Sequence, residues 1–107
     1  MTFTELASAL KNVPVQELRA MEEDYVELVV TVDELASVEA QLSSCFGAPL
    51  KPKGMAPSAA AIALSAAYGG IQGNQIMYYR KEASGAELAM IWPWGNGLQA
   101  TVKVIKE

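Results

Sequence analysis

The sequence has no histidine and only one cysteine, Cys45. Histidine is the commonest general base near neutral pH and the commonest zinc ligand, so its absence excludes a Ser-His-Asp or Cys-His site made from this chain alone. A single cysteine excludes an intramolecular disulfide and, with no histidine, argues against a structural zinc site. The N-terminus shows no signal-peptide pattern. We therefore expect a cytoplasmic protein with no metal and no cofactor.

Charged residues are also few, at 19% of the chain, and the net charge is −4. Acids are concentrated in residues 1–46, whereas basic residues outnumber acids in residues 47–107. Because nucleic-acid binding depends on cationic contacts to phosphate, a chain that is acidic overall is not expected to bind nucleic acid. The acidic cluster Glu22-Glu23-Asp24 does not by itself converge on a metal ion.

One stretch, residues 54–71, has no charge at all. We reject a membrane helix there because Ala, Gly and Ser dominate, Pro57 lies inside it, and it is barely long enough to span a bilayer. We therefore expect no association with a membrane. With 51% hydrophobic residues in a chain of 107, residues 1–107 are predicted to form one globular domain.

The chain begins with a helix signal. Thr2 and Glu5 have the spacing of a capping box, and apolar residues at helical spacing follow them. A helix is therefore predicted from residue 3 to about residue 11, where Pro14 ends it. Residues 15–21 are predicted to form a second short helix, with a strand as the alternative.

The clearest strand and the clearest amphipathic helix come next. Residues 25–32 alternate and are rich in β-branched side chains, which predicts a strand with one buried face. A helix is predicted from about 34 to 46, with Asp33 or Thr31 as its cap and Gly47 as its stop.

The segment after this helix contains three prolines in residues 48–57 and is predicted to be irregular. Ser58 is a candidate cap for a helix over 59–68, which Gly69-Gly70 ends. This helix has almost no polar face, so it is expected to be buried.

The rest of the chain alternates like an antiparallel meander. Three strands are predicted, over 75–82, 86–94 and 98–106. The resulting fold is a two-layer α+β domain in the order α-α-β-α-α-β-β-β, with about four antiparallel strands and helices packed on one face.

The two tryptophans of the chain flank Pro93 next to a glycine-rich turn. By strand parity, Trp92 and Trp94 are expected on the same face as Leu98, Ala100, Val102 and Val104, which predicts that Trp92 belongs to the core. Pro93 suits an edge or a bulge, and a bulge would turn Trp94 outward. Trp94 and Pro93 are therefore predicted to lie at an interface or to form a pocket lid, with a place at the rim of the core as the alternative for Trp94.

The best candidate for ligand binding is the loop that carries Lys51, Lys53 and Gly54, together with Ser58 at the predicted helix start. Lysines beside free helix N–H groups favour an anion such as a nucleotide or a carboxylate. The alternative is a solvated connection whose prolines set the direction in which the helix begins.

A second candidate surface lies on the predicted sheet. If the face that carries Tyr79 is open, Tyr79 joins Thr101 and Lys103 in a surface able to stack on a base or to bind an anion. The alternative is ordinary cross-strand pairing among tyrosines and long charged side chains.

No sequence motif identifies a function. The leading hypothesis is a small soluble non-catalytic binding or accessory domain that acts as a homo-oligomer or with a protein partner. A small-molecule anion binder at residues 51–58 is the alternative, and an enzyme based on Glu or Asp chemistry ranks last.

Overall fold

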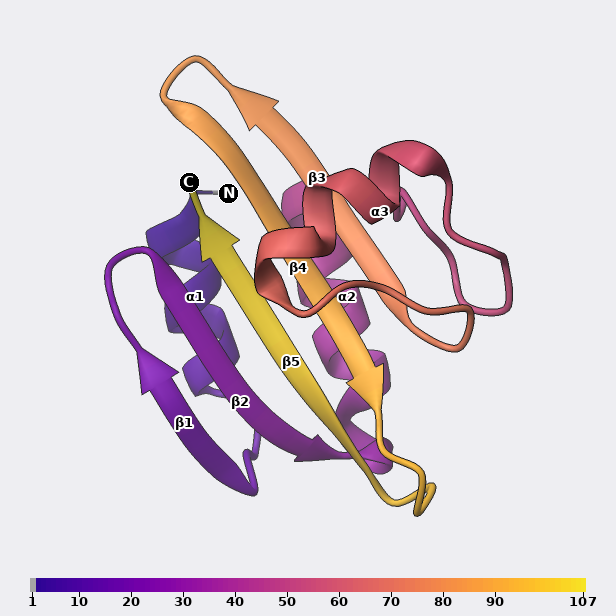
Figure 1. Ribbon diagram of the computed structural model, residues 1–107. Coiled ribbons are helices and arrows are strands. Elements are labelled where there is room, and N and C mark those ends of the chain that lie inside the picture. The colour runs from indigo at the N-terminus through magenta and orange to yellow at the C-terminus, as the bar shows by residue number, and fades with distance from the viewer. Residues whose placement is uncertain (1) are drawn as a thin grey trace.

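Five antiparallel strands form one sheet, and helices cover both of its faces (Figure 1). The computed structural model describes residues 2–107. The strand order is β1-β2-β5-β4-β3. The elements in chain order are α1 (Phe3–Lys11), β1 (Glu17–Met21), β2 (Tyr25–Thr31), the 3-10 turn η1 (Val32–Glu34), α2 (Leu35–Phe46), α3 (Ala59–Ser65), the 3-10 turn η2 (Ala66–Tyr68), β3 (Ile76–Glu82), β4 (Gly85–Pro93) and β5 (Gln99–Lys106).

The α+β prediction with an antiparallel sheet is confirmed, but the sheet has one strand more than expected. The predicted helix over 15–21 is wrong, and the strand alternative is correct: β1 pairs antiparallel with β2. The Glu22 N–H donates to the Tyr25 carbonyl at 2.8 Å and closes the hairpin. Tertiary pairing with β2 outweighs the weak helical spacing of Leu18 and Met21, and Leu18 stays 52% exposed.

One face of the sheet packs against α1 and α2. The core there joins Val26, Leu28 and Val30 of β2 to Val38 and Leu42 of α2. The predicted capping box of α1 is present. The predicted cap of the helix over 34–46, Asp33 or Thr31, is wrong. A 3-10 turn precedes α2, and neither the N-cap of that turn nor the N-cap of α2 makes a side-chain cap hydrogen bond.

The opposite face packs against α3 and the loops around it, so the expectation of helices on one face is wrong. Leu88 and Met90 of β4 are buried on the α3 side, and the alternate residues Ala89 and Ile91 are buried on the other side. A strand that is apolar on both faces needs cover on both. The expectation that α3 itself is buried is also wrong, because within that helix only Ala61 and Ser65 are buried.

The register between β4 and β5 corrects the predicted position of Trp92. Trp92 lies opposite Thr101, and Met90 lies opposite Lys103. Trp92 therefore points to the α3 face, whereas Val102 and its neighbours of like parity point to the α1 and α2 face. The parity of one strand does not determine that of the next, since the loop between them sets the register.

Candidate functional site

Lys51, the first residue of the predicted anion loop, is almost fully buried, at 2% exposure. Its Nζ donates to the carbonyl oxygens of Pro52 at 2.9 Å, Gly73 at 2.6 Å and Gln75 at 2.6 Å. An ammonium group has three N–H donors, so these three acceptors satisfy it. Burial lowers the pKa of Lys51 from its usual value. The side chain thus fastens the loop to the chain segment ahead of β3.

The other residues of this loop are not brought together around an empty site. The Ser58 hydroxyl accepts the Ala61 N–H at 3.1 Å as the helix cap, as predicted. Lys53 and Gly54 are exposed, and the Gly54 N–H donates to the Gly73 carbonyl at 2.8 Å. Anion binding here stays a prediction, and Lys53 is the lysine of the loop whose side chain is exposed.

Trp94 folds back over the α3 side of the sheet. Its indole Nε1 donates to the Thr101 hydroxyl at 2.8 Å, and the Arg19 guanidinium lies 5.7 Å from its ring centre. Pro93 ends β4 opposite Ala100. Trp94 is half-buried in this position, and its predicted role at an interface or as a lid stays a prediction.

A charged strip, which we define as Arg19, Glu27 and Lys103, crosses the same face of the sheet. Lys103 Nζ lies 3.9 Å from the centre of the Trp92 ring and 3.4 Å from the Tyr68 carbonyl oxygen. Arg19 Nη1 lies 3.4 Å from Glu27 Oε2.

The neighbours of Glu27 hold its side chain in the charged form. The Tyr25 hydroxyl donates to Glu27. This hydrogen bond, followed by the charges of Lys103 and Arg19, holds the pKa of Glu27 below its usual value. Tyr79 lies on the same face of the sheet as Thr101 and Lys103, as predicted. It packs against the apolar cluster beneath α3, so it does not form an open surface for stacking.

Sequence reasoning missed one buried ion pair on the α2 side. Arg80 Nη2 donates to both oxygens of Glu87, at 3.1 and 3.2 Å, and Glu87 is 5% exposed. Arg80 Nη1 also donates to the Cys45 carbonyl near the end of α2, at 2.9 Å. The pair joins the helix to the sheet, which is a structural role. Arg80 and Glu87 lie opposite each other across the β3–β4 hairpin, so strand register could have revealed them.

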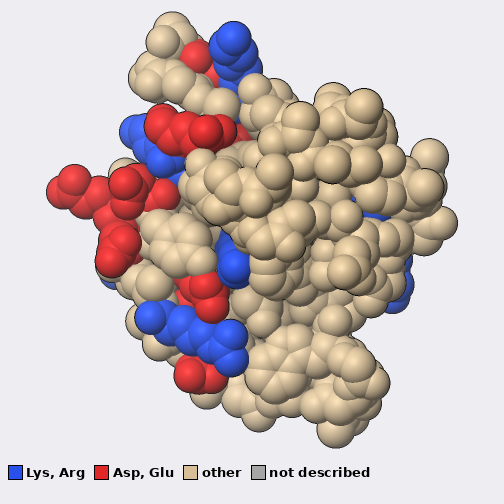
Figure 2. All heavy atoms as spheres, viewed as in Figure 1, with Lys and Arg blue, Asp and Glu red and all other residues tan. Residues whose placement is uncertain are grey.

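A surface without charge lies on the outside of α3. No charged residue occurs between Lys53 and Arg80, and Figure 2 shows a broad region without charged atoms on this side of the molecule. Met55 is 59% exposed and Ile62 is 54% exposed. We define the uncharged face as a set of exposed residues, four of which have the i, i+3, i+4, i+7 spacing of one helix face: Met55, Ala59, Ile62, Ala63 and Ala66.

Within residues 2–107, no three His, Cys, Asp or Glu side chains are grouped so that they could hold a metal ion. In the same part of the chain, every helix is too short or too polar to cross a bilayer. Comparison of the chain with protein-family models, curated proteins and solved structures finds no match.

Proposed function

We propose that this domain is a non-catalytic association module that pairs with a second copy through the uncharged face. The observation that carries the proposal is the exposed apolar stripe on α3, which packs on the sheet through Ala61 and leaves Ile62 in solvent. Contiguous apolar surface of this kind marks interaction sites in soluble proteins.

The lack of charge on the uncharged face and the small size of its alanine side chains both favour a second copy as its binding partner. A two-fold contact brings the same patch of both molecules together, and this patch brings no like charges into contact although the chain carries −4 overall. Alanine side chains at Ala59, Ala63 and Ala66 let two helices approach closely. Burial of one exposed Ile or Met side chain contributes roughly 1.5–3 kcal/mol.

Light scattering after size-exclusion chromatography, from about 1 µM to 1 mM protein, tests the proposal. We expect a dimer that forms with rising concentration and that is lost in Ile62→Lys. Leu98→Lys is the matched control, because Leu98 is 64% exposed and lies outside the uncharged face. Circular dichroism checks that both variants remain folded.

A wild-type chain that stays monomeric over this range contradicts self-association. Loss of the dimer in Leu98→Lys but not in Ile62→Lys places the contact elsewhere and contradicts the assigned face. Heterologous association in a pull-down that Ile62→Lys abolishes, with a monomeric wild type, replaces the second copy by a protein partner.

A further inference from the structure

The two edge strands of the sheet, β3 and β1, differ in how far their outer backbone groups are paired. The β3 edge is closed in part by Lys51, whose N–H donates to the Met77 carbonyl at 3.1 Å and whose carbonyl accepts the Met77 N–H at 3.0 Å. In the part of the chain that the structure describes, β1 has β2 as its sole neighbour. The outer side of β1 therefore presents backbone donors and acceptors to solvent.

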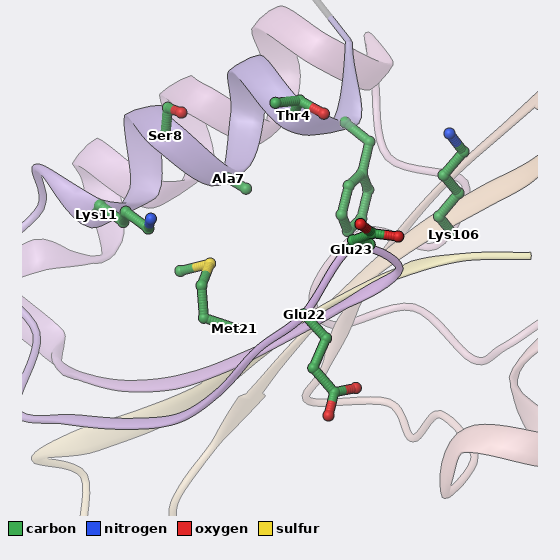
Figure 3. A pocket seen from close by; sticks show the side chains of 9 residues that line it. Thr4, Ala7, Ser8, Lys11, Met21, Glu22, Glu23 and Lys106 are labelled. Carbon is green, nitrogen blue, oxygen red and sulfur yellow. The ribbon is translucent and has the colours of Figure 1, made fainter.

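A groove of about 560 Å³ runs between the β1–β2 hairpin and α1 (Figure 3). Its apolar lining is made by Phe3, Ala7 and Met21, and hydroxyl groups come from Thr4 and Ser8. Leu18 of β1 is opposite Leu28, which faces the α1 and α2 core, so the half-exposed Leu18 side chain projects on the same side of the sheet as the groove.

We propose that β1 and this groove bind an extended peptide segment of a partner protein as an added antiparallel strand. The β1 backbone supplies the hydrogen bonds, and every second side chain of the segment enters the groove beside α1. This surface is distinct from the uncharged face on the other side of the sheet.

Charge at the two ends of the groove determines which segment fits. Lys11 ends α1 and lies at the end of the groove where β1 begins, whereas Glu23 and Lys106 lie at the other end (Figure 3). Glu22 also follows β1, but its side chain points away from α1 and from the groove, so Glu23 and Lys106 balance each other at this second end (Figure 3). An antiparallel strand starts beside the balanced pair Glu23 and Lys106 and finishes beside Lys11. The matching segment has alternating apolar residues and ends on an acidic residue beside Lys11.

The short length and the bulge of β1 favour pairing with one short peptide segment over pairing with the edge strand of another sheet. The strand has five residues and a bulge between Leu18 and Ala20. Short and bulged edges discourage indiscriminate pairing between sheets. Selection of the partner therefore depends on the side chains that enter the groove.

The test uses two blocked peptides of equal composition, acetyl-Lys-Thr-Val-Thr-Val-Thr-Glu-amide and the same peptide with Lys and Glu exchanged. Each is titrated into isotopically labelled protein while amide chemical shifts are followed. We expect shifts concentrated in residues 17–21 and along α1, and a Kd at least about threefold lower for the peptide with Lys first. Lys11→Glu should reverse this preference, and Lys53→Glu should leave it unchanged.

Ser8→Trp narrows the groove from an exposed position, and we expect it to weaken binding by about tenfold. Ile62→Lys should bind the peptide like the wild type, so failure of self-association and failure of peptide binding can be told apart. The absence of shifts in residues 17–21 at about 1 mM peptide overturns the proposal. Equal affinity for the two peptides overturns the charge assignment.

Discussion

The indole of Trp92 occupies the space that a side chain at residue 69 would need. A Cβ atom placed on Gly69 would lie 2.4 Å from Trp92 Cη2. On the ring face of Trp92 lies the Lys103 ammonium group, which also donates to the Tyr68 carbonyl. Trp92 therefore holds the segment after α3, at Tyr68 and Gly69, against the sheet. The sequence had predicted Trp92 in the core on the α1 and α2 face of the sheet.

Gly69→Ala should destabilise the fold more than Gly70→Ala. Both glycines have positive φ, +103° and +81°, but a Cβ on Gly70 meets no atom within 4 Å. Gly70→Ala should cost about 1 kcal/mol from backbone strain alone. Gly69→Ala adds a contact with Trp92 and should cost about 1–3 kcal/mol more. Urea denaturation measures both values, and equal losses would show that Trp92 does not restrict residue 69.

Lys51→Met should lower the free energy of unfolding by about 2–4 kcal/mol, because it leaves three carbonyl oxygens without their donor. Lys53→Met, two residues away and exposed, should change it by less than about 0.5 kcal/mol. Thermal and urea unfolding of both variants make the comparison. Similar losses in the two variants would contradict the structural role of Lys51.

The role of Lys51 also changes how anion binding at the loop is tested. Removal of Lys51 perturbs the fold, so a lost ligand response in that variant has two explanations. Lys53→Ala is the cleaner variant. If a panel of nucleotides and carboxylates raises the melting temperature, Lys53→Ala should reduce the shift. An unchanged shift would place the ligand elsewhere.

Arg80→Met should cost about 3 kcal/mol, because it leaves the buried Glu87 carboxylate without its cation. Glu87→Gln should cost less, because Glu82 stays 3.5 Å from Arg80 Nε. The double variant should cost less than the sum of the two single variants, since one interaction is lost in both. Arg80→Lys should recover little, because lysine cannot bond both Glu87 oxygens and the Cys45 carbonyl in the same geometry. Chemical denaturation of the four variants gives the coupling, and strict additivity would contradict it.

Tyr25→Phe should raise the pKa of Glu27, because the Tyr25 hydroxyl is the largest cause of its lowered value. A carboxyl group with a lowered pKa stabilises the fold above its unfolded pKa, near 4.5, and loses this contribution as pH falls through the folded pKa. The stability difference between wild type and Tyr25→Phe should therefore shrink in acid. Carboxyl carbon NMR titration follows Glu27 directly, and an unchanged pKa would contradict the assignment.

Local signals in the sequence predicted the elements whose ends are determined locally. The capping box of Thr2 and Glu5 and the Ser58 cap are made by residues three apart, and both are present. The stripe on α2 places Val38 and Leu42 in the core, as helical spacing predicts. The strand at residues 25–31 follows from its alternation.

What the sequence by itself determined is therefore the type of fold, a single antiparallel sheet with helices, because periodicity and caps act over a few residues. Only the tertiary structure decided that β1 is a strand, that α3 covers the second face, and where Lys51 and Trp92 point. Two of the three acceptors of Lys51 lie 22 and 24 residues away, at Gly73 and Gln75. Contacts of this range depend on register and chain crossing, which short-range patterns do not encode.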